Sequence, residues 1–154
     1  GLYPPSSTIK PLLTIFALNN EYTNRDETIF DDGFLRFEQE ERIFNAWREG
    51  GHGLTDLEKA LVESSNPFFM NLSIRYEKDL FVEFLRSSSF GSKLCEDCYP
   101  HQFSPLIDDD WKYKNFGKEL YKGDFINLGV CQKIQIYCLQ IKYERLKLLM
   151  LVNS

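Results

Sequence analysis

The sequence has 154 residues, a formal net charge of −5 at pH 7 and 43% hydrophobic residues. This length and composition are typical of one folded domain with a real core, so we expect a single domain over residues 1–154 and exclude a disordered chain. The acidic balance argues against a surface that attracts nucleic acid as a whole. No apolar run reaches the ~20 residues that a membrane span needs.

The chain opens with a predicted helix. It begins near Ile9, where Ser7 or Thr8 can cap it, and Pro11 falls in its first turn, where proline is tolerated. The following residues are strongly apolar, and the asparagine pair that begins at Asn19 is a suitable stop. This segment therefore predicts a largely buried helix.

A second helix is predicted from Asp31 or the next residue to about Trp47, since carboxylates suit a helix N-terminus. In that helix Gln39 is a polar residue on an otherwise inward-looking face. Residues 49–53 read as a loop, which makes His52 a solvent-exposed loop histidine.

The middle of the chain is less regular. Residues 55–65 fit either a short helix, through the capping-box pattern T-D-L-E, or a strand, and both remain open. Residues 68–76 have strand character. Glu77 stands at the entrance of a predicted helix over 78–86, and residues 87–116 read as a long surface loop with room for one short helix.

Towards the C-terminus the pattern predicts a β-hairpin, with strands over 124–130 and 133–142, because β-branched and aromatic residues dominate both segments. Metal-dependent nucleases of the PD-(D/E)xK type carry their chemistry on such a hairpin. Their mid-strand carboxylate would fall here on Asn127, with Gly129 on the same face. The predicted hairpin fits such a nuclease, but the mid-strand carboxylate that the chemistry requires is absent from it.

A cysteine-rich segment offers a metal-binding alternative. Cys95, Cys98 and His101 have the C-x-x-C-x-x-H spacing of three zinc ligands. A fourth ligand would have to be remote: Cys131, Cys138 or His52. No second ligand pair is evident in the sequence, so we interpret the cysteines as free thiols.

Several short motifs, in this order and spacing, resemble one known family. They are Glu21-Tyr22 after the first helix, Val62-Glu63-Ser64 before Asn66-Pro67, Glu119-Leu120-Tyr121, Phe125 to Val130 and Ile136 to Leu139. Together they resemble the N-terminal endonuclease domain of the orthomyxovirus polymerase acidic protein (PA), in its thogotovirus branch.

The resemblance implies an α/β fold, in which helices surround a central mixed twisted sheet of the PD-(D/E)xK endonuclease type. It places the family's catalytic or metal-binding side chains on Gln39, Glu77, Glu119, Asn127 and Ile141. Of these only Glu77 and Glu119 keep an acid, so it implies a degenerate site, with Mn²⁺ or Mg²⁺ bound weakly at best and no other cofactor.

The function implied is a structural and interaction module of a viral RNA-dependent RNA polymerase, with cap-snatching activity absent and enzymatic activity uncertain. Its partners would be the two basic polymerase subunits, with RNA contacted weakly and no membrane, and its location the host nucleus and the virion. We expect the chain to lack the family's further C-terminal helices, and the virus species stays open. One alternative is an active endonuclease that recruits Glu63, Asp124 or Lys142. Another is an unrelated zinc-stabilised host-interaction protein.

Overall fold

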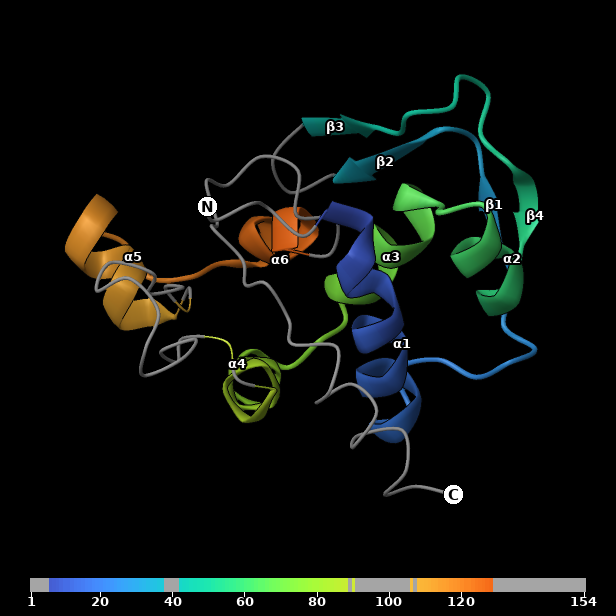
Figure 1. Ribbon diagram of the computed structural model, residues 1–154. Coiled ribbons are helices and arrows are strands. Elements are labelled where there is room, and N and C mark those ends of the chain that lie inside the picture. Colours follow the sequence, from blue (N-terminus) through green and yellow to red (C-terminus); the bar gives the residue numbers. More distant parts are fainter. Residues whose placement is uncertain (1–5, 38–41, 89, 91–105, 107, 129–154) are drawn as a thin grey trace, which may run out of the picture.

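The computed structural model describes residues 6–37, 42–88, 90, 106 and 108–128 (Figure 1). The elements are, in chain order, η1 (Ser6–Ile9), α1 (Lys10–Asn19), β1 (Ile29–Asp31), β2 (Phe34–Phe37), β3 (Arg42–Asn45), β4 (Gly53–Thr55), α2 (Leu57–Val62), α3 (Asn66–Ser73), α4 (Lys78–Ser87), α5 (Asp109–Phe116) and α6 (Lys122–Leu128). None of the helices in these ranges is long and apolar enough to cross a membrane.

Helix α1 lies at the centre of the molecule, beside α3 (Figure 1). Pro11 occupies its first turn and the helix ends at Asn19, so the predicted bounds are confirmed. The N-cap position of α1 is Ile9, so neither Ser7 nor Thr8 occupies it. The ring of Phe16 anchors an aromatic core around the C-terminal half of the helix. Its centroid lies 4.7 to 5.7 Å from the rings of Tyr22, Tyr76, Phe81 and Phe84.

Helix α3 was predicted as a strand over residues 68–76, and this prediction is wrong. Ser65 caps the helix by accepting a hydrogen bond from the Phe68 amide, and Pro67 stands in the first turn. The helix packs against α1, α2, α6 and strand β2, and seven of its eight residues are buried. A helix that is buried all round shows no amphipathic period, so its apolar run looks the same as that of a buried strand.

Two antiparallel strand pairs replace the predicted second helix. Strand β1 pairs with β4, with Asp31 opposite Gly53, and β2 pairs with β3, with Phe34 opposite Asn45. Gly33 separates β1 from β2 with φ of +88°, a conformation that a right-handed helix cannot contain. The predicted helix from Asp31 to Trp47 is therefore wrong, and so is the central mixed sheet, since the described strands form only these two pairs.

Three of the remaining helices, α2, α4 and α5, begin at an acidic residue whose side chain caps the helix. Glu77 caps α4, and its carboxylate accepts hydrogen bonds from the amides of Asp79 and Leu80, which confirms the predicted helix entrance. Between residues 55 and 65 the helical alternative is the correct one, because Asp56 caps α2. Helix α5 begins after its cap, Asp108, and is the one described helix inside the predicted loop 87–116.

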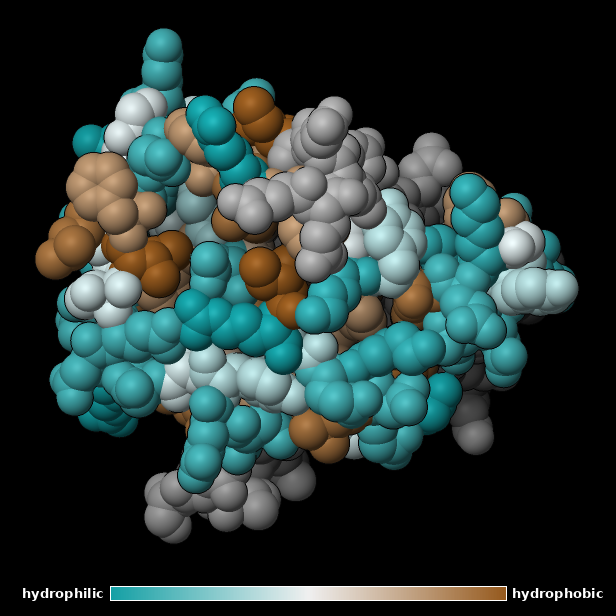
Figure 2. Space-filling model, turned by 180° about the vertical axis from the view of Figure 1, so that it is seen from behind, coloured by the Kyte–Doolittle hydropathy of each residue, from teal (hydrophilic) through white to brown (hydrophobic). Residues whose placement is uncertain are grey.

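The predicted strand over 124–130 is wrong up to residue 128, because residues 122–128 form helix α6. Most of this helix is buried, and the Lys112 ammonium of α5 donates to the Asp124 carboxylate at its start. The second predicted strand, 133–142, lies outside the described residues. Seen from behind, the surface is mainly hydrophilic with scattered apolar groups (Figure 2). The largest exposed ones include Phe30 and Leu54, which face each other across β1 and β4.

Candidate active site

Two polar side chains project from the start of α1. Ser7 lies in the single 3-10 turn η1, and Lys10 is the first residue of α1, three positions on. This spacing places both side chains on the same side of the chain, about one turn apart. Ser7 is exposed, whereas only 2% of the Lys10 surface is accessible. An exposed hydroxyl and a buried amine thus come from the same end of α1.

Two further polar side chains come from the turn between α2 and α3. Ser64 adopts a left-handed conformation, with φ of +54°, directly before the cap of α3, and Asn66 is the first residue of that helix. A non-glycine residue with positive φ is strained by roughly 1 to 3 kcal/mol, and such strain persists where the surroundings hold it. The conformation brings the Ser64 hydroxyl to the N-terminal end of α1.

The four side chains meet through short hydrogen bonds. The Lys10 Nζ donates to the Ser64 carbonyl oxygen at 2.7 Å, to the Ser64 Oγ at 2.9 Å and to the Asn66 Oδ1 at 2.7 Å. The Ser64 Oγ in turn donates to the Ser7 Oγ at 2.8 Å. The result is a continuous path from Lys10 through Ser64 to Ser7. A hydroxyl, a relaying hydroxyl and an amine in this order can activate the first hydroxyl as a nucleophile.

Burial makes Lys10 a usable base. Removing its ammonium from water lowers the pKa of Lys10 to about 8, even though the negative charge of Asp31 opposes the shift. With that pKa about one amine in ten is neutral at pH 7, against roughly three in ten thousand for an ordinary lysine. A neutral amine can accept a proton that an ammonium cannot.

Asn66 contributes a donor that no described residue uses. Its Oδ1 accepts from Lys10, but its Nδ2 is buried without a hydrogen-bond partner among the described residues. Unpaired buried donors are rare because the group loses water and gains nothing. In an otherwise satisfied cluster, this N–H is a candidate ligand-binding group.

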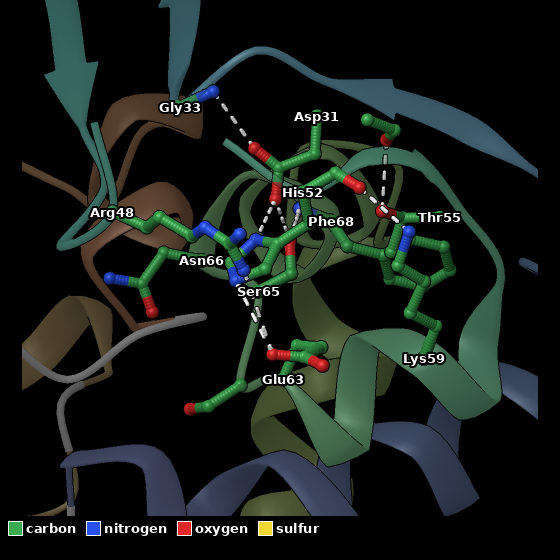
Figure 3. Close-up of polar contacts among 12 residues, drawn as sticks. Asp31, Gly33, Arg48, His52, Thr55, Lys59, Glu63, Ser65, Asn66 and Phe68 are labelled. Atoms are coloured by element: carbon green, nitrogen blue, oxygen red, sulfur yellow. Dashed lines mark hydrogen bonds and ion pairs between the residues drawn. The ribbon is translucent and has the colours of Figure 1, made fainter. Parts of the chain in front are cut away.

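His52 is not the exposed loop histidine that the sequence predicted. Its side chain is buried, and its Nδ1 lies 2.8 Å from the Asp31 Oδ2. The Asp31 carboxylate also accepts from the Ser65 hydroxyl at 2.6 Å (Figure 3). The loop 49–53 folds back against β1, which is why a histidine in a glycine-rich segment becomes buried.

The residues that the endonuclease resemblance selected lie elsewhere. Glu77 is exposed and caps α4, and Glu119 is exposed as well. Asn127 sits in α6 rather than mid-strand, and its Nδ2 donates to the Gly123 carbonyl. Gln39 and Ile141 lie outside the described residues. The weak metal role of Glu77 and Glu119 therefore stays a prediction.

The residues of the two alternative sites, the rearranged endonuclease site and the zinc site, do not form a described metal cluster either. Asp124 is paired with Lys112, and Glu63 lies beside Arg48 at 3.9 Å. Lys142 and the zinc candidates Cys95, Cys98, His101, Cys131 and Cys138 lie outside the described residues. Within the part of the chain that the structure describes, no three His, Cys, Asp or Glu residues are grouped so as to hold a metal ion.

Comparison with known proteins identifies the family. A family model described as the penicillin binding protein transpeptidase domain matches residues 1–139. The chain is 30% identical over 132 residues to the peptidoglycan D,D-transpeptidase MrdA of Escherichia coli K12, a match that covers 86% of this chain and 21% of MrdA. The chain belongs to the penicillin-binding-protein transpeptidase family. It spans about a fifth of the length of the curated relatives it matches.

Solved structures agree with this placement. Penicillin-binding protein PBP2 of Pseudomonas aeruginosa, in complex with WCK 5153, superimposes with a TM-score of 0.77 at 26% identity, over 84% of this chain and 28% of that one. PBP2 of Helicobacter pylori, in complex with MreC, gives a TM-score of 0.74 at 27% identity, over 84% of this chain and 24% of that one.

The viral assignment is therefore wrong. The fold is that of a penicillin-binding-protein transpeptidase domain and not of a PD-(D/E)xK endonuclease. The polymerase function, the polymerase subunits and RNA as partners, and the host nucleus and virion as location fall with it, because the relatives are bacterial peptidoglycan transpeptidases. The matched viral motifs were two to six residues long, and their order alone carried the resemblance.

The sequence did contain the correct signal. Penicillin-binding proteins carry a serine nucleophile in an S-x-x-K motif, together with an S-x-N motif and a K-T-G motif. Ser7 to Lys10 is S-T-I-K, and Ser64 to Asn66 is S-S-N. Ser7 was interpreted as a possible helix cap, Ser64 and Asn66 as parts of viral motifs, and Lys10 was given no role, so the site was missed.

Proposed function

We propose that this chain supplies the nucleophile and the proton relay of a peptidoglycan D,D-transpeptidase. The observation that carries the proposal is the hydrogen-bonded path from Lys10 through Ser64 to the exposed Ser7. The printed sequence contains the S-x-x-K and S-x-N motifs but no K-T-G triad. The proposal therefore concerns the roles of Ser7, Lys10, Ser64 and Asn66 in that reaction.

The first half-reaction is acylation of Ser7. Its Oγ attacks the carbonyl carbon of a D-alanyl-D-alanine amide while its proton passes to Ser64 and the Ser64 proton passes to neutral Lys10. Hydroxyl hydrogens rotate freely, so the same hydrogen bonds serve in either direction. When the amide C–N bond breaks, the proton returns along the path to the departing D-alanine nitrogen. An ester on Ser7 is left.

The second half-reaction reverses the roles. The amine of a neighbouring peptide attacks the Ser7 ester, its proton enters the path to Lys10, and the Ser7 oxygen leaves and recovers a proton. A new amide bond joins the two peptides. The Asn66 Nδ2, which has no hydrogen-bond partner among the described residues, would donate to a carbonyl of the bound peptide. The N–H is already removed from water in the folded protein, so this hydrogen bond carries no further desolvation cost on its side.

The test is release of D-alanine from a peptide that ends in D-alanyl-D-alanine, with an amine acceptor present. The full-length protein should release D-alanine and form the cross-linked product, and Ser7→Ala should abolish both. Ser6→Gly is the matched control, because Ser6 is an exposed neighbour with φ of +48° that glycine adopts without strain. Equal release by wild type and Ser7→Ala would overturn the proposal. Release without cross-linking would show a carboxypeptidase instead.

A further inference from the structure

A second cluster of buried groups lies behind the proposed active site. The Asp31 side chain is fully buried, and three separate segments donate to its carboxylate (Figure 3). The Gly33 amide donates to Oδ1 at 2.9 Å, and the Ser65 hydroxyl and the His52 Nδ1 share Oδ2 at 2.6 and 2.8 Å. A carboxylate with this many donors stays ionised: burial raises the pKa of Asp31, but these hydrogen bonds outweigh burial and hold it below the ordinary value.

The cluster acts on the S-x-N turn through its middle residue. Ser65 lies between Ser64 and Asn66, and its Oγ donates to Asp31 while accepting from the Phe68 amide. Ser64 needs surroundings that hold its positive φ. Asp31 fixes the residue that follows Ser64, so it fixes the direction from which both Ser64 and Asn66 approach Lys10.

Asp31 also acts on Lys10 through space. Its negative charge stabilises the Lys10 ammonium and so works against the burial that lowers the pKa of Lys10. Charged or titratable groups that the structure describes around this region include His52, Arg48, Glu63 at the end of α2, and Lys59, whose Nζ donates to the carbonyls of His52 and Leu54. Glu63 is directed towards Arg48 and the His52 ring.

We propose that Asp31 is a positioning residue for this site: through Ser65 it holds the Ser64–Asn66 turn in its strained geometry against Lys10. The effect of Asp31 on catalysis rests on the proposed function. Its effect on the geometry of the turn involves only residues of this chain and can be measured without a bound ligand.

The experiment compares Asp31→Asn with Asp32→Asn in the full-length protein. Asp32 is the exposed neighbour, so its variant removes the same charge from the surface without touching the cluster. The first readout is the pKa of Lys10, followed by NMR of labelled lysine side chains. Asp31→Asn should lower it by about half a unit or more, because a stabilising negative charge is lost, and Asp32→Asn should leave it unchanged.

The second readout is the rate of Ser7 acylation by a fluorescent penicillin as a function of pH. In Asp31→Asn the rate should fall at its optimum at least about tenfold, as expected when a relay is misplaced. Its rise with pH should move to lower pH along with Lys10. Ser65→Ala keeps the charge and removes the hydrogen bond, so its rate should fall with no movement of the pH profile. This second variant also covers the case in which Asp31→Asn does not fold.

The outcomes separate the two proposals. A normal Lys10 pKa and a normal rate in Asp31→Asn, with the wild type acylated, would overturn the role of Asp31 alone. A lowered Lys10 pKa in Asp31→Asn, with no acylation of the wild type, would support that role in Lys10 and overturn the proposed function. If Asp31→Asn is acylated more slowly but its pH profile and its Lys10 pKa are unchanged, the proposed effect of the Asp31 charge on Lys10 would be overturned.

Discussion

At the scale of single residues, Lys10 decides what the site can do. It is a lysine held almost out of water, and its pKa of about 8 lies well below the ordinary value. The three oxygen atoms around its Nζ satisfy the amine, and the ring of Phe69, 5.5 Å away, closes one side. Since burial disfavours the charged form, the fold carries a penalty whenever Lys10 is protonated.

This penalty predicts an unusual dependence of stability on pH. Between about pH 8 and 10.5 the unfolded chain holds a proton on Lys10 that the folded chain has released, so stability should rise with pH. Compared with a Lys10→Met variant, the wild type should gain about 2 kcal/mol between pH 7.5 and about 9.5. Urea unfolding at the two pH values measures the gap. Burial also raises the pKa of Tyr76, but Tyr76 is present in both the wild type and Lys10→Met, so its effect on stability cancels in the comparison. A gap that stays constant would mean that Lys10 titrates normally.

The same residue shows why the site was missed from the sequence. Lys10 stands in an apolar segment, and a lone lysine at the start of a helix is usually an exposed charge. Ser7 and Lys10 form a motif of two specified positions, which many unrelated chains contain. Their meaning depends on Ser64 and Asn66, which lie more than fifty residues later and meet them only in the folded chain.

At the scale of elements, the loop that carries His52 is folded tightly against β1. Gly51 has φ of +67°, and a Cβ added there would lie 2.2 Å from the Asp31 carbonyl oxygen. Gly50 has φ of +76°, but a Cβ added there meets nothing within 4 Å. A substitution at Gly50 would thus introduce backbone strain alone, whereas one at Gly51 would introduce both backbone strain and a steric clash.

We therefore predict unequal effects for two alanine substitutions. Gly50→Ala should lower the free energy of unfolding by roughly 1 to 2 kcal/mol, because only the positive φ is strained. Gly51→Ala should lower it by more than about 3 kcal/mol, because the loop must also move away from Asp31. Urea denaturation of both variants measures the difference. Equal effects would show that the loop does not pack against β1 as described.

Which elements could be predicted depends on how they are buried. Helix α4 has a polar cap in Glu77 and one exposed face, and its bounds were predicted almost to the residue. Helices α3 and α6 are buried on nearly every side, so their apolar runs resemble strands. Strands β2 and β3 were predicted as a helix because Leu35, Ile43 and Ala46 fall at helical spacing, while the pairing of the two strands is not visible in the sequence.

At the scale of the whole molecule, the packing of α1 against α3 creates the site. Ser7 and Lys10 stand at the N-terminal end of α1, and the turn that carries Ser64 leads into α3 beside it (Figure 1). The aromatic core around Phe16 holds the other end of α1. The candidate site thus depends on two buried helices, of which the sequence predicted only one.

The central claim is that Ser7 is the nucleophile of a penicillin-binding transpeptidase site. The most direct measurement is to incubate the full-length protein with benzylpenicillin, digest it and locate the covalent adduct by mass spectrometry. The account predicts one penicilloyl group, on the peptide that contains Ser7, absent from Ser7→Ala and formed far more slowly in Lys10→Met. An adduct on another residue, or an equal adduct in Ser7→Ala, would contradict it.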